Sequence, residues 1–104
     1  MKRRVVITGV GLVSALGLET KTTWKGLLEG RSGIAPITQF DASSFSTRIA
    51  AEVKDLDPLA YLDAKNARKM DRFILHAIAA SECAVSNSGL KVTPENSHRI
   101  GVYI

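Results

Sequence analysis

The chain has 104 residues and a formal net charge of +4, with 45% hydrophobic, 23% charged and 6% aromatic residues. This composition is typical of one globular domain. It excludes a membrane span, because no stretch approaches the roughly 18 consecutive apolar residues that a span requires. It does not indicate nucleic-acid binding, since aromatic residues are few and the only dense basic run is Lys2-Arg3-Arg4. The single cysteine, Cys83, cannot form an internal disulfide, which indicates a reducing compartment such as the cytoplasm.

Residues 3–8 are almost continuously apolar and rich in β-branched side chains, which predicts a central strand covered on both faces. A signal peptide is disfavoured, because glycines soon interrupt the apolar run. A loop from Gly9 to Gly17 follows. Its opening is similar to a dinucleotide-binding turn, but Ser14 stands where a third glycine is needed and no helix opens there. We therefore interpret the loop as a tight turn that packs against a sheet.

The next segment predicts a helix that Thr20 or Thr22 caps and that ends near Glu29, stopped by Gly30 and Gly33. Its buried face is expected to consist of three apolar residues, Trp24, Leu27 and Leu28. Residues 34–45 are expected to be irregular and residues 48–53 to form a short strand. Turns are predicted at 57–58 and at 93–95, where proline follows a capping residue.

Residues 64–88 have helical periodicity, with Asp63 as the expected N-cap and residues 87–89 as the end. Asp71 offers a second start, which would divide the segment into two abutting helices. Four basic residues recur at i, i+3, i+4 and i+7, a spacing that places them on one arc of a single helix: Lys65, Arg68, Lys69 and Arg72. Such a stripe could bind an acidic partner, remain merely solvated, or lie on a membrane surface, although Glu82 and Asp71 flank it.

Residues 99–104 again have the pattern of a buried strand, which continues to the last residue. Two central strands need neighbours in a sheet, and a small sheet would leave apolar edges unpaired. We therefore interpret residues 1–104 as an incomplete domain, a piece of a larger chain. In isolation, this piece is expected to be aggregation-prone or partly molten.

Residues that could carry catalysis do not form a convincing set. Cys83 lies far along the predicted helix beside Glu82, and His76 is two turns before it, too far for a hydrogen bond. His98 belongs to a loop before the last predicted strand. No cysteine and histidine have the spacing of metal ligands, and the carboxylates are scattered.

Several stretches, taken together and in order, resemble the beginning of the β-ketoacyl-acyl-carrier-protein synthases, and most closely the synthase II subgroup. The resemblance covers essentially the whole chain. It rests on residues 4–17 (RVVITGVGLVSALG), 23–28 (TWKGLL), 30–34 (GRSGI), 40–41 (FD), 48–53 (RIAAEV), 67–73 (ARKMDRF), 88–90 (SGL), 95–96 (EN) and 99–102 (RIGV).

This resemblance implies an α/β fold of the thiolase type, layered αβαβα in complete enzymes, which are much longer and usually homodimeric. Residues 1–104 would be the start of the first half. It also implies elongation of fatty acyl chains by decarboxylative condensation with a malonyl thioester. The family's catalytic cysteine and two histidines would lie beyond Ile104, so the isolated chain is expected to be inactive. No cofactor of its own is implied, because the phosphopantetheine arm belongs to the acyl carrier protein.

The resemblance also implies a role for the basic residues. In the family, the helix that matches residues 65–72 helps to dock the acidic acyl carrier protein. The matching positions are Lys65, Arg68 and Lys69, with Arg72 as the fourth candidate. Two other hypotheses remain: a non-catalytic partner similar to chain-length factors, which share these N-terminal stretches, and a small binding module that uses the basic helix 64–88.

Overall fold

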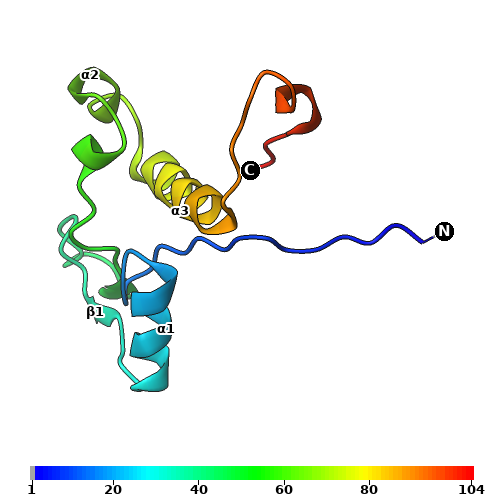
Figure 1. The fold of residues 1–104 in the computed structure, drawn as a ribbon. Coiled ribbons are helices and arrows are strands. Elements are labelled where there is room, and N and C mark those ends of the chain that lie inside the picture. The colour runs from blue at the N-terminus through cyan, green and yellow to red at the C-terminus, as the bar shows by residue number, and fades with distance from the viewer. Residues whose placement is uncertain (1) are drawn as a thin grey trace.

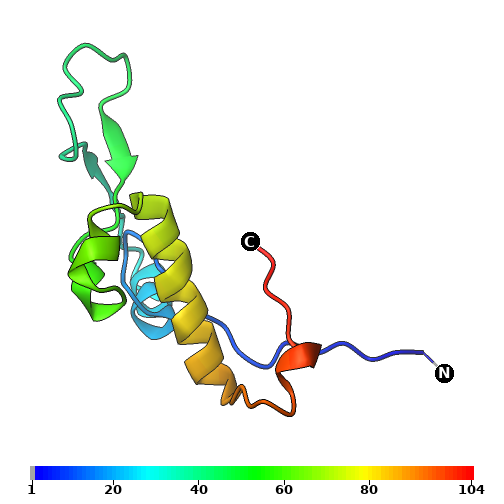
Figure 2. The same cartoon turned by 90° about the horizontal axis from the view of Figure 1, so that it is seen from above.

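The computed structural model describes residues 2–104 of the chain. Within that range it contains the helices α1 (Thr20–Leu28), α2 (Ala64–Ala67) and α3 (Arg72–Ser88), the strands β1 (Ile34–Pro36) and β2 (Ile49–Ala51), and the 3-10 turns η1 (Pro58–Ala60) and η2 (Ser97–Arg99). The extended N-terminal segment runs past α3 and on to α1, while the loop that joins β1 to β2 projects away from the helices (Figures 1 and 2).

The described chain is extended in shape. Its radius of gyration is 17.2 Å and its principal extents are 56 × 38 × 23 Å. A compact domain of this length would have a radius of gyration of about 13 Å. The buried apolar residues in the described range are only Ala42, Leu75 and Ala79. Most of the apolar surface therefore lacks a covering layer within these residues.

The strand predicted over residues 3–8 is not present. This segment is extended, but no strand lies beside it within the described residues. Val5 is 93% exposed and Ile7 is 86% exposed. An extended segment becomes a strand only when a neighbour accepts and donates its backbone hydrogen bonds. The apolar pattern is therefore real, but the pairing that it predicts is missing.

The predicted C-terminal strand is also wrong for this structure. Its first residue belongs to η2, and residues 100–104 form no ladder with another strand. Tyr103 and Ile104 are almost fully exposed. The predicted turn before it is present, because the amides of Asn96 and Ser97 both donate to the carbonyl oxygen of Thr93.

These exposures lead to an expectation for the isolated polypeptide of residues 1–104. We expect a broad thermal transition without a steep midpoint, together with strong binding of an apolar dye, because the small core cannot offset the chain entropy. Circular dichroism and dye fluorescence would measure this. A sharp, cooperative melt of the monomer would contradict it.

The glycine loop packs against α3. A Cβ atom on Gly11 would overlap the carbonyl oxygen of Ala80, and one on Gly9 would overlap that of Ala84. The amide of Val10, between them, donates to Oδ1 of Asn87 at 3.0 Å. The interpretation of a tight packing turn is therefore supported in its use of glycine, but the turn packs against a helix rather than a sheet.

Helix α1 forms where the sequence predicts it, and Gly30 ends it with a left-handed φ of +65°. Its N-cap is Glu19, rather than either threonine, and the Glu19 amide donates to Oγ1 of Thr22 at 3.3 Å.

The predicted buried face of α1 is wrong. Trp24 is 60% exposed and Leu28 is 71% exposed, while Thr23 and Gly26 are buried instead. Thr23 lies within 2.8 Å of the Ser14 hydroxyl, which ties α1 to the preceding loop.

Strands β1 and β2 form an antiparallel pair, with Ile34 opposite Ala51 and Pro36 opposite Ile49. The sequence predicts β2 but not β1, since residues 34–45 were expected to be irregular. Immediately after β2, the Glu52 carboxylate accepts hydrogen bonds from the amide and hydroxyl of Thr38 and from the amide of Gln39, at 2.8–3.2 Å. The Thr38 hydroxyl is the main cause of a lowered pKa for Glu52.

The Glu52 contacts predict a pH-dependent hairpin. A lowered pKa means that the charged carboxylate stabilises the fold above its ordinary pKa, and that this stabilisation is lost as the pH falls through the folded value. In the complete protein, E52Q is expected to speed amide exchange in residues 37–48 at pH 7, and the difference from the wild type should vanish in acid. E95Q, which changes an exposed glutamate outside the hairpin, is the control. Unchanged exchange in E52Q at pH 7 would contradict the assignment.

Candidate functional site

The four basic residues singled out from the sequence lie at the junction of α2 and α3. We call this group the basic corner: Lys65, Arg68, Lys69 and Arg72. The junction begins at Asp63, whose Oδ1 accepts from the amides of Lys65 and Asn66 at 3.0 and 2.9 Å. These bonds, led by the one from Asn66, lower the pKa of Asp63. The predicted N-cap is thus confirmed, and it fixes the start of the first turn.

The basic corner does not lie on one continuous helix. Helix α2 ends at Ala67, and the amides of Lys69 and Met70 both donate to the carbonyl oxygen of Asn66. Asp71 then has extended angles, φ −67° and ψ 154°, which interrupt the helix before α3 begins. The single-arc expectation for the four cations is therefore wrong. The alternative of a second start at Asp71 is confirmed, as is the end of α3 at Gly89, with a φ of +68°.

All four cations of the basic corner are nevertheless exposed, and they lie within eight residues of one another in the sequence. Lys65 lies in α2, Arg68 and Lys69 in the turn, and Arg72 opens α3. The break converts a stripe along a helix into a cluster at a bend. Such a cluster can still present several cations to one acidic surface.

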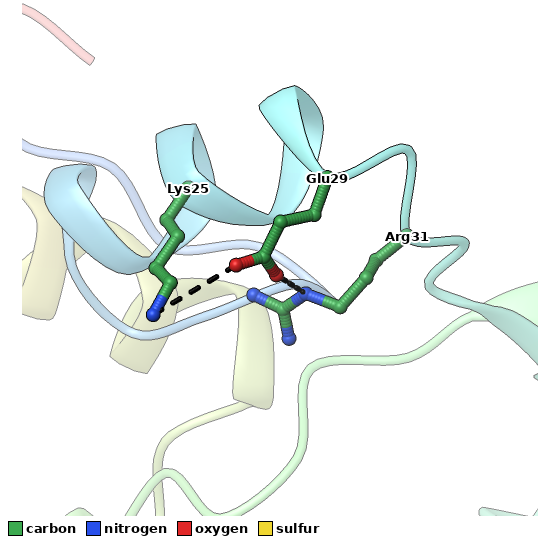
Figure 3. Close-up of polar contacts among 3 residues, drawn as sticks. All are labelled: Lys25, Glu29 and Arg31. Atoms are coloured by element: carbon green, nitrogen blue, oxygen red, sulfur yellow. Dashed lines mark ion pairs between the residues drawn. The ribbon is translucent and has the colours of Figure 1, made fainter.

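The ion pairs of residues 2–104 lie elsewhere, at the end of α1 (Figure 3). Glu29 is 3.0 Å from Nε of Arg31 and 3.8 Å from Nζ of Lys25. No carboxylate of the described residues comes within 4.0 Å of a cation in the basic corner. The cations of the corner thus form no ion pair within the described residues, unlike those at the end of α1.

Arg72 differs from the other three cations in one respect. Its Nη2 donates to the backbone carbonyl oxygen of Val53 at 3.1 Å, across 19 positions of the sequence. Sequence periodicity could not reveal this contact, because the acceptor is a backbone atom in a separate segment.

Cysteine and histidine do not assemble into a catalytic group. Cys83 is half-buried and lines an open hollow of about 470 Å³ between the start of α1 and α3, together with Glu82, Lys21 and Tyr61. Neither histidine lines that hollow. His76 Nε2 is buried, and no partner for it lies among the described residues.

Across residues 2–104, no cluster of three metal-ligating side chains occurs. No helix in this range is long and apolar enough to cross a bilayer.

Comparison with known proteins assigns the family. The family model described as "Beta-ketoacyl synthase, N-terminal domain" matches residues 2–104. The chain belongs to the beta-ketoacyl synthase family. This confirms the resemblance found in the sequence.

Among the curated relatives of this synthase chain are three proteins named 3-oxoacyl-[acyl-carrier-protein] synthase 2. Those of Vibrio harveyi and Coxiella burnetii are 53% and 52% identical over 103 residues, and that of Synechocystis is 46% identical. Each match covers 99% of this chain but only 25% of the relative. The chain therefore spans about a quarter of the length of these synthases.

A solved structure gives the fold. The chain is similar to "The ishigamide ketosynthase/chain length factor", with a TM-score of 0.75 and 37% sequence identity, over 88% of this chain and 23% of that one. The predicted class, α/β of the thiolase type, is thereby confirmed. The match covers 23% of that structure, so the similarity extends over only part of its fold.

Proposed function

We propose that this chain is the N-terminal part of a 3-oxoacyl-acyl-carrier-protein synthase of type 2. The complete enzyme would elongate fatty acyl chains by joining an enzyme-bound acyl group to a malonyl unit on an acyl carrier protein, with loss of CO₂. Identity with synthases of that name, sustained along almost the entire chain, is the observation that carries the proposal.

Within this function, the chain would contribute docking rather than chemistry. The resemblance implies that the catalytic cysteine and two histidines would lie in the remaining part of the synthase. Cys83, His76 and His98 form no catalytic group here. Residues 1–104 would be the start of the first thiolase-like half. The complete enzyme would be a cytoplasmic homodimer, and its phosphopantetheine arm would be supplied by the carrier protein.

The basic corner is the proposed docking surface for the carrier protein. Lys65, Arg68 and Lys69 have exposed side chains that make no ion pair among the described residues. An acidic carrier protein would supply the missing counter-charges. Such contacts accelerate encounter and fix register, and salt weakens them because exposed charges are screened beyond about 8–10 Å.

A second candidate function is supported by the solved neighbour, whose title includes a chain-length factor as well as a ketosynthase. Chain-length-factor-like proteins would share this N-terminal segment without catalysing the condensation themselves. The small-module hypothesis is weaker, since the family model extends over the whole described chain and not only over residues 64–88.

A condensation assay on the complete protein tests the proposal. Incubated alone with acyl- and malonyl-acyl carrier protein, the complete protein should release CO₂ and form the 3-oxoacyl product. Product formation only after addition of a separate ketosynthase would instead support the chain-length-factor role. No product under either condition would contradict both.

A further inference from the structure

The side chain of Arg72 makes a hydrogen bond within the chain, unlike its neighbours in the basic corner. Its Nη2–Val53 O bond of 3.1 Å joins the first residue of α3 to the segment that follows β2. Lys65, Arg68 and Lys69 make no side-chain hydrogen bond or ion pair within the described residues. The guanidinium of Arg72 is thus partly committed to an internal acceptor, while the other three cations are free to meet a partner.

The side chain of Arg72 also contributes to the interior of the junction. It lines a small cavity of about 90 Å³ together with Pro58 of η1, Ala67 of α2, Met70 of the turn and Leu75 of α3. Long basic side chains commonly pack their methylene stems on apolar surface while the charged end reaches a polar group. Arg72 therefore lines the space beside the bend that carries Lys65, Arg68 and Lys69, while its charged end reaches Val53.

Local helix energetics do not explain an arginine at this position. Arg72 is the first residue of α3, and the first turn contains no acidic side chain. A cation at a helix N-terminus is disfavoured, because the helix dipole is positive there. The bond to Val53 offers the compensation, since a guanidinium donor to a carbonyl oxygen is a charge-assisted hydrogen bond.

We infer that Arg72 is a positioning residue that sets the angle of the basic corner, so that Lys65, Arg68 and Lys69 face one partner together. This inference rests on the proposed function, in which those three residues dock the carrier protein. It assigns Arg72 a different role from theirs: Arg72 acts through the backbone of Val53, and the other three act through their own charges.

A matched pair of variants in the complete synthase separates the two roles. R72M removes the guanidinium but keeps an apolar stem, and K69M removes a neighbouring charge that has no internal partner. R72M should speed exchange of the Lys69 and Met70 amides about fivefold, while the Thr23 amide in α1 reports whether the rest of the fold is intact. K69M should leave the exchange of the Met70 amide unchanged.

Carrier-protein binding then shows whether the angle between α2 and α3 affects docking. K69M should weaken binding and reduce its salt dependence, because one charge contact is lost. R72M should weaken binding about tenfold with the salt dependence unchanged, and should add nothing in a K65E/R68E/K69E background. With carrier-free acyl and malonyl thioesters, R72M should lose much less kcat/KM than it loses with the carrier-borne substrates.

Three results would overturn the inference. The first is unchanged exchange of the Lys69 and Met70 amides in R72M. The second is a reduced salt dependence of carrier-protein binding in R72M, like that of K69M, and the third is a loss of binding that adds fully to that of the triple variant. Each would mean that Arg72 either contacts the partner directly or has no role in docking. If the triple variant itself binds the carrier protein normally, the proposed docking function is wrong. In that case, the exchange data still report whether Arg72 holds the bend.

Discussion

G11A is expected to destabilise the complete synthase by about 3 kcal/mol, near the upper end of the cost of overpacking. The added methyl group would overlap the carbonyl oxygen of Ala80 and the amide nitrogen of Ala84, both in the backbone of α3. Backbone atoms in the middle of a helix cannot rotate away as a side chain can. The loop must therefore move from α3, which would also disturb the Val10–Asn87 hydrogen bond.

Thermal melting and the yield of folded enzyme measure this effect. The matched control is G89N, at another glycine, where φ is +68° and no atom lies within 4 Å of the added Cβ. Asparagine tolerates this left-handed conformation at a helix end, so G89N should cost less than about 1 kcal/mol. Equal stability of G11A and G89N would show that the glycine loop is not pressed against α3.

Charge reversal at the basic corner is expected to have the largest effect on function. K65E/R68E/K69E should weaken binding of the acyl carrier protein about 100-fold or more, because like charges facing each other across an interface cost several kcal/mol. The loss should be greatest at low salt and should shrink as ionic strength rises. Titration of the complete synthase with carrier protein, at several salt concentrations, measures it.

The control reverses three exposed lysines outside the corner: K2E/K21E/K91E. It changes the net charge of the protein by the same amount, so it isolates the position of the charges from their number. Its effect on binding should be no more than about threefold, as expected for long-range steering alone. Equal losses in both triple variants would mean that binding depends on overall charge and not on this surface.

Local signals in the sequence predicted the chain breaks well. Asp63 caps two amides with its side chain, Asp71 interrupts the helix with extended backbone angles and no side-chain capping bond, and Gly89 adopts a left-handed angle. Each acts within one turn of its own position, so the residue type indicates the role. The family also followed from short stretches whose order is specific. The location of the basic corner could likewise be predicted, although its division between two helices rested on one residue, Asp71.

Features that depend on distant partners could not be predicted. Val5 and Ile7 have the pattern of a buried strand, but a pattern does not reveal whether a neighbouring strand is within reach. Trp24 and Leu28 form an apolar face whose cover is not among the described residues. The Arg72–Val53 bond joins positions 19 apart through a backbone acceptor, which carries no signature in side-chain periodicity.

The central claim is that the basic corner binds the carrier protein and takes no part in the condensation. One comparison of kcat/KM in the complete synthase tests it most directly. The donor is presented either on the acyl carrier protein or as a carrier-free acyl thioester, to the wild type and to K65E/R68E/K69E. The malonyl unit is supplied as a carrier-free thioester in both cases, so only the donor depends on docking. The account predicts a loss of about 100-fold with the carrier-borne donor and less than about twofold with the carrier-free donor. An equal loss with both donors would contradict it, because the basic corner would then act on the condensation itself or on the stability of the enzyme.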